Sequence, residues 1–147
     1  MQNVINKLSK RRRIMFYILM LIALIAISID RFFDIQATSY FGEENSMLMV
    51  YGLITYKVVE LSILYLIFYH RHMKKLFLDE NREELLQKFE KNAKRFFTLV
   101  PHGSVIFGII SYKLTVNIWF FLLFILIAAT ALFLVKPHKI IKTAESN

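Results

Sequence analysis

The chain has 147 residues, enough for one domain, and 56% of them are hydrophobic, which is more apolar surface than a soluble domain of this size can bury. The formal net charge is +8, but the basic residues flank apolar runs, which indicates a membrane surface and argues against nucleic acid as a partner. The chain has no cysteine, which excludes disulfides, thiolate metal sites and cysteine nucleophiles.

Four apolar runs follow one another along the chain, at about residues 14–33, 47–69, 96–112 and 117–135. A bilayer core of ~30 Å takes roughly 20 helical residues to cross, and only helices satisfy their own backbone groups there. The sequence therefore predicts one all-α domain over residues 1–147, an integral membrane four-helix bundle. The last two runs are joined so closely that their helices must be antiparallel neighbours. We expect the first two to form a second hairpin.

The distribution of Lys and Arg predicts the orientation of the chain. Basic residues crowd the N-terminal tail, the connection 70–95 and the C-terminal tail, whereas the other two connections contain only Arg31 and Lys113. By the positive-inside rule both termini and the loop 70–95 are cytoplasmic, in a multi-pass protein of the plasma or inner membrane. Membrane lipids, especially anionic ones, are then expected partners.

The connection 70–95 contains a helical pattern of its own. Asp79 is a candidate N-cap, and the apolar residues after it recur at helical spacing, opposite a basic face. They are Leu85, Leu86, Phe89, Ala93 and Phe96. The pattern predicts an interfacial amphipathic helix between spans two and three. Docking on a partner protein is the alternative.

A polar cluster is predicted inside the first two spans. Lys57 and Glu60 lie within the second apolar run, where an unpartnered charge costs at least ~2.5–3.5 kcal/mol. Carboxylates recur at intervals of four at the end of the first run. We expect one buried cluster that clamps the first two helices together, made of Asp30, Asp34, Thr38, Glu44, Asn45, Lys57 and Glu60. The cluster is interpreted as a structural network; a proton or ion relay is the alternative.

The stretch "DIQATSYFGEEN", followed by Lys57, carries the pattern D-x3-T-x3-G-x-E-N and then a lysine in the next helix. In this the chain resembles a family of small, uncharacterised prokaryotic multi-span membrane proteins, a domain of unknown function. The matching residues are Asp34, Thr38, Gly42, Glu44, Asn45 and Lys57, and Ser46 stands where the family has proline. The resemblance covers roughly the first half of the chain and implies a membrane fold, but no reaction.

The inventory of reactive residues predicts a protein that is not an enzyme. G-x-S-x-G, a P-loop, H-x3-H and H-E-x-x-H are all missing from the sequence. His70 and His102 are the candidates for a haem or metal ligand, but we expect no cofactor and no metal. The function predicted is a non-catalytic accessory or stabilising subunit that packs its fourth helix against a larger membrane complex. The alternative is a homo-oligomeric small transporter or channel that uses the Asp/Lys/Glu cluster.

Overall fold

The protein is all-helical in the part that its structure, a computed structural model, describes: residues 2–33, 43–66 and 82–135. That part contains four helices and no strand, namely α1 (Gln2–Phe32), α2 (Glu43–Tyr65), α4 (Arg82–Thr115) and α5 (Ile118–Leu134). The all-α prediction is therefore confirmed. Of these helices, α1, α2 and α4 are long and apolar enough to cross a membrane. α5 is as apolar but has only 17 residues, about 25 Å of helix, at the lower limit of the spanning range.

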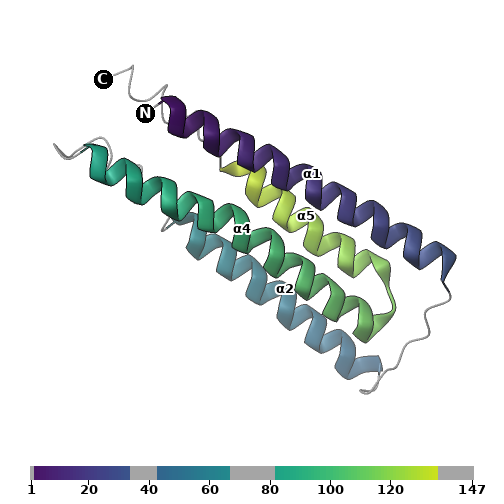
Figure 1. Cartoon of the computed structure of the whole chain (residues 1–147). Helices are drawn as coiled ribbons and strands as arrows, with labels where there is room; N and C mark the ends of the chain where they lie inside the picture. Colours follow the sequence, from purple (N-terminus) through teal and green to yellow (C-terminus); the bar gives the residue numbers. More distant parts are fainter. Residues whose placement is uncertain (1, 34–42, 67–81, 136–147) are drawn as a thin grey trace.

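The four helices lie side by side along one direction (Figure 1). α1 begins and α5 ends at the same end of the bundle. We call this end the basic end, because the first turns of α1 carry Lys7, Lys10, Arg11, Arg12 and Arg13 there. α1 and α2 lie on opposite sides of the bundle, with α1 packed on α4 and α5, and α2 packed mainly on α4. The prediction of a hairpin between the first two helices is therefore wrong.

α4 and α5 form the antiparallel hairpin that their short connection predicts. The N–H of Val116 donates to the Tyr112 carbonyl at 2.7 Å, and Val116 has a φ of 51°, a left-handed conformation that is costly for a β-branched residue. Asn117 then caps α5 by accepting the N–H of Trp119 at 3.0 Å. Further along, the two helices touch so closely that a Cβ added to Gly108 would lie 2.8 Å from the Phe121 ring.

One apolar core joins α1, α4 and α5. From α1 it takes Ile5, Leu8 and Leu19; its other members are Phe89, Ala93, Phe96, Phe97 and Val100 of α4, Phe121, Ile125, Ala128 and Leu132 of α5, and Val135. α5 therefore buries much of its surface within the bundle itself. The face of α5 that α1 and α4 cover is not available to another protein. Packing of the fourth helix against a larger complex stays a prediction for its outer face, where Leu126 and Phe133 are exposed.

α4 runs as a single helix of 34 residues through the predicted amphipathic segment and the third apolar run. At 1.5 Å per residue it is about 51 Å long, well beyond a ~30 Å bilayer core. The helical pattern from Leu85 onward is confirmed, but its apolar face contacts protein and not lipid, and its position at the membrane interface stays a prediction. Phe89, Ala93 and Phe96 are buried in the core with Ile5 and Leu8 of α1, so this face has another helix as its partner instead of lipid.

Candidate functional site

The two charged residues of the second apolar run form an ion pair within α2. Nζ of Lys57 lies 2.9 Å from Oε2 of Glu60, three residues later in the same helix. The Lys57 side chain is 1% exposed and the Glu60 side chain 33% exposed. The cation is therefore enclosed by the bundle, whereas the carboxylate reaches its surface.

α4 provides the space that Lys57 occupies. A Cβ added to Gly103 would lie 2.8 Å from Nζ of Lys57, and the centroid of the Phe107 ring lies 5.4 Å from the same atom. An ammonium group at that distance from an aromatic ring is attracted by the ring electrons. Glycine and phenylalanine one turn apart on α4 thus give the lysine both room and a second favourable contact.

Phe107 also links three helices through ring contacts. Its centroid lies 5.9 Å from that of Tyr56 on α2 and 6.1 Å from that of Phe124 on α5, both edge to face. A third ring pair joins Tyr51 of α2 to Phe120 of α5, with centroids 6.4 Å apart. Such pairs add about 0.5–1.5 kcal/mol each beyond the area they bury. The ion pair is therefore set in an aromatic layer between α2, α4 and α5.

Two hydroxyl groups of α2, two residues before Lys57 and two residues after Glu60, are engaged within their own helix. Thr55 donates to the Tyr51 carbonyl at 2.9 Å, and Ser62 donates to the Val58 carbonyl at 2.8 Å. A proton relay needs side chains that pass a hydrogen bond onward, and these two do not extend the bonding of Lys57. The arrangement is that of a closed pair, which can hold one helix in register against another.

The other predicted members of the cluster that the structure describes lie away from Lys57 and Glu60. Asp30 is on α1 and accepts a hydrogen bond from the Tyr112 hydroxyl of α4 at 2.6 Å. Glu44 and Asn45, in the first turn of α2, are exposed, as is Arg31 of α1. Asp34 and Thr38 lie outside the described residues. The prediction that one cluster joins α1 to α2 is wrong for Asp30, because its partner is a tyrosine of α4.

Three residues of these contacts were missed by the sequence reasoning. Tyr112 was read as part of an apolar run, although its hydroxyl is a donor that suits a carboxylate on a neighbouring helix. Gly103 and Phe107 are uncharged, so the sequence does not indicate that they contact Lys57. Ser104 and Gly108, four residues apart, are a pair of small residues that predicts close helix approach, and the contact of Gly108 with Phe121 confirms it.

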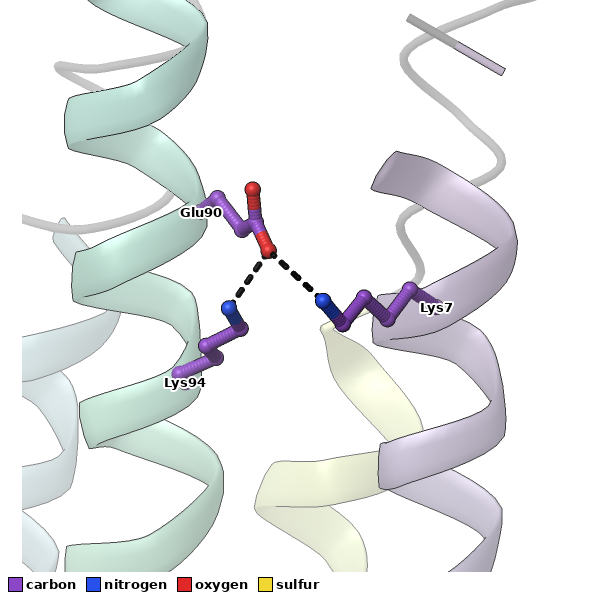
Figure 2. A network of polar contacts seen from close by, with 3 residues as sticks. All are labelled: Lys7, Glu90 and Lys94. Atoms are coloured by element: carbon purple, nitrogen blue, oxygen red, sulfur yellow. Dashed lines mark ion pairs between the residues drawn. The ribbon is translucent and has the colours of Figure 1, made fainter. Parts of the chain in front are cut away.

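A second group of charges joins α1 to α4 near the basic end. Figure 2 shows Glu90 of α4 between Lys94 of the same helix and Lys7 of α1. The Lys7 ammonium lies 3.9 Å from the carboxylate. The hydrogen bond from Lys94 lowers the pKa of Glu90; partial burial opposes this, and the charges of Lys94 and Lys7 lower the pKa further. Glu90 is therefore ionised at neutral pH and bridges the two helices.

Two arginines of α1, one helical turn after Lys7, donate hydrogen bonds to α4 and to the C-cap of α5. Arg11 donates to the Thr98 hydroxyl of α4 at 3.0 Å, and Arg12 donates to the Val135 carbonyl at 3.2 Å. Val135 is the C-cap of α5, where a cation also favourably meets the negative end of the helix dipole. The basic residues thus anchor α1 against both helices.

The histidine candidates do not form a ligand set in the described residues. His102 is exposed, and its Nδ1 lies 2.7 Å from the Thr98 carbonyl, an acceptor that makes Nδ1 the donor. His70 lies outside the described residues. No group of three or more potential metal-binding residues occurs in the ranges 2–33, 43–66 and 82–135.

Comparison of the chain with protein-family models, with curated proteins and with solved structures finds no match.

Proposed function

We propose that the chain is a multi-pass integral membrane protein with its basic end in the cytoplasm. The support is the position of the charges relative to the apolar lengths. The N-terminal turns of α1 and the start of α4, with Lys88, Lys91 and Arg95, lie at one end of the bundle. The segments that follow them are apolar. Such an asymmetry is the usual determinant of orientation.

Within that membrane, the proposed function is that of a non-catalytic accessory subunit of a larger membrane protein complex. The observation that carries the proposal is the enclosed ion pair: Lys57 is 1% exposed and neutralised by Glu60 inside its own chain. A cation enclosed between helices and neutralised within its own chain has a structural use, and it is Lys57 that is so enclosed. What the bundle offers to other molecules is then its outer faces.

Two outer faces are apolar and available for contact with another membrane protein. On α1 the exposed side chains include Leu21, Leu24 and Ile25, at 57%, 61% and 50%. On α2 they include Leu48, at 74%, and Val59, at 51%. α5 packs one face on α1 and α4, and its opposite side also offers exposed apolar side chains, among them Leu126 at 62% and Phe133 at 63%.

The test is purification from native membranes in mild detergent, followed by mass spectrometry of the proteins that accompany the chain. A photo-reactive residue placed at Leu24 or Leu48 should capture the same partner, whereas one placed at the buried Phe124 should capture none. Isolation of a lone monomer, with no cross-linked product from either exposed position, would refute the accessory role.

A homo-oligomeric transporter or channel is the second candidate, favoured by the partial exposure of Glu60. A carboxylate 33% exposed within an apolar run could face a second copy of the chain across an interface. Purified protein in liposomes decides between the two functions. Proton or ion movement that Lys57→Met abolishes would establish the transporter and reject the accessory subunit.

A further inference from the structure

A hollow with one charged and one apolar end lies where α1 meets the last turn of α5. Its volume is about 270 Å³ and its lining is Arg12, Arg13, Phe16, Tyr17, Leu132 and Phe133. Two of these side chains are cationic and four are apolar or aromatic, and no carboxylate is among them. The hollow is therefore suited to an anionic ligand that also has an apolar part.

The two arginines differ in what else they do. Arg12 donates to the Val135 carbonyl at 3.2 Å, so its guanidinium is held at the end of α5. Arg13 is exposed, and none of the described residues forms an ion pair with it. A guanidinium group binds phosphate through two parallel hydrogen bonds, and the fixed Arg12 beside the accessible Arg13 forms such a pair of donors.

Aromatic rings lie one helical turn beyond each arginine. Phe16 follows Arg12 by four residues and Tyr17 follows Arg13 by four, so each ring lies on the same ridge as its arginine. The two rings meet edge to face with centroids 6.5 Å apart, and Phe133 of α5 lies across from them, 63% exposed. The apolar wall thus begins directly beside the cationic end.

The apolar wall then continues along α1 for the depth of one leaflet. Met20, Leu21, Leu24 and Ile25 extend the two ridges, each at least 47% exposed. From Arg13 to Ile25 the helix rises about 18 Å, close to the ~15 Å that half of a bilayer core measures. A ligand with a charged head at Arg13 and a chain along this ridge would end near the middle of the membrane.

We propose that this hollow binds one anionic glycerophospholipid of the cytoplasmic leaflet. The lipid phosphate lies between Arg12 and Arg13, and one acyl chain follows Phe16 and Tyr17 along α1. The net charge of the lining selects anionic over zwitterionic headgroups. The inference rests on the proposed membrane placement, but not on the proposed accessory role, since a lone monomer would contain the same hollow.

Native mass spectrometry of the detergent-solubilised full chain tests the site. We expect one bound phosphatidylglycerol with at least a roughly fivefold preference over phosphatidylcholine, and a loss of roughly fivefold in phosphatidylglycerol affinity for Arg13→Gln. Lys91→Gln removes the same charge from an exposed position of α4 outside the hollow and should change nothing. Millimolar inorganic phosphate should not displace the lipid, because it lacks the chain.

A second variant addresses the apolar wall. Phe16→Ala leaves both arginines in place and should lower retention of phosphatidylglycerol at least twofold, whereas Leu48→Ala on the distant face of α2 should not. Circular dichroism and gel filtration establish that each variant is folded. Equal losses for Arg13→Gln and Lys91→Gln, or equal binding of phosphatidylcholine and phosphatidylglycerol by the unaltered chain, would overturn the proposal. These outcomes leave the test of the accessory role unaffected, because that test detects proteins.

Discussion

The unit formed by α1, α4 and α5 shares one apolar core, whereas no member of that core cluster in the described residues belongs to α2. Leu61 and Leu64 of α2 touch the cluster but are only partly buried. Among the described side chains of α2, three are buried: Ser46, Val50 and Lys57. α2 therefore depends on polar and aromatic contacts for its attachment, and the other three helices depend on apolar burial.

A groove between α2 and α5 reflects the same difference. It has a volume of about 510 Å³, with Phe96 of α4 among its lining residues, and its walls include Leu61 and Tyr65 of α2 and Leu126 and Leu134 of α5. Here α2 does not close against α5, while α4 and α5 touch through Gly108 and Phe121. In a membrane, an apolar helix face gains little by contacting protein in place of lipid. A polar contact such as the ion pair of Lys57 and Glu60 can then attach a peripheral helix.

Removal of Glu60 should have the largest effect, and it should fall on α2. Glu60→Leu leaves Lys57 enclosed without a counter-charge, which destabilises proteins by about 3–5 kcal/mol. The chain has no cysteine, so a disulfide between cysteines introduced in α2 and α5, at positions chosen for Cβ atoms about 4 Å apart, reports the attachment of α2. We expect the yield of this disulfide to fall in Glu60→Leu.

The matched control replaces both charges. Lys57→Met with Glu60→Leu removes the need for neutralisation, and such replacements of a buried pair are often neutral or stabilising by about 1–4 kcal/mol. The double variant should therefore recover the yield of the disulfide. A double variant as weakly attached as Glu60→Leu alone would show that the charges do more than neutralise each other.

The hydrogen bond between Tyr112 and Asp30 provides the next test, on the other side of the bundle. Tyr112→Phe deprives the partly buried carboxylate of its donor, and hydrogen bonds to charged groups contribute about 1.5–3 kcal/mol. Thermal unfolding in detergent should reveal that loss, while Tyr51→Phe, at an exposed tyrosine of α2, should unfold like the unaltered chain. Equal stability of the two variants would mean that the hydrogen bond between Tyr112 and Asp30 contributes nothing to holding α1 on α4.

The positions of the helices along the chain could be predicted from the sequence, but the helices on which α1 and α2 pack could not. Apolar length determines where a helix runs, and each of the four runs overlaps one of the helices α1, α2, α4 and α5, although residues 67–69 of the second run lie outside the described residues. The pairing of α1 with α2 was inferred from opposite charges, Asp30 with Lys57, because charge is the feature that a sequence displays most plainly. A neutral donor such as Tyr112 satisfies Asp30 equally well, and the ten or so residues between α1 and α2 do not force them together.

The same reasoning explains the error at the start of α4. The stripe that includes Phe89, Ala93 and Phe96 is apolar, as predicted, but periodicity does not say whether lipid or protein covers it. Ile5 and Leu8 of α1 were read as part of a tail, although their spacing of three residues fits one helical face. In the candidate site, Lys57 and Glu60 can be predicted from their charge within an apolar run. The role of Gly103 depends on α4 lying beside Lys57, which the sequence does not indicate.

Replacement of a glycine by alanine compares how well the contact between α4 and α5, on the one hand, and α2, on the other, tolerate an added methyl group. Gly108→Ala places a Cβ 2.8 Å from the Phe121 ring and 3.4 Å from its backbone oxygen, so overpacking of about 1–3 kcal/mol should exceed the helix-propensity gain of about 1 kcal/mol. Gly52→Ala on α2 meets nothing within 4 Å and should be stabilising by about 0.5–1 kcal/mol. Unfolding midpoints that move in the same direction for both would contradict the contrast between a tight unit and a peripheral helix.

The smallest effect is expected from pH, at the contact of Lys7 with Glu90. The pKa of Glu90 in the folded protein is lowered, chiefly by the hydrogen bond from Lys94, so its contribution to stability is present above the ordinary value of 4.5 and is lost as the pH falls below it. For a largely surface contact the loss is about 0.5 kcal/mol.

Spin labels at Asn3 and Gln87, both exposed, should report a broader distribution of distances between α1 and α4 in acid. Glu90→Gln should show that breadth already at neutral pH, whereas Glu84→Gln, which removes an ion pair confined to α4, should keep the distance narrow. An acid-insensitive distance in the unaltered chain would assign the attachment of the α1 N-terminus to contacts that do not titrate there, namely the packing of Ile5 and Leu8 and the hydrogen bond from Arg11 to Thr98.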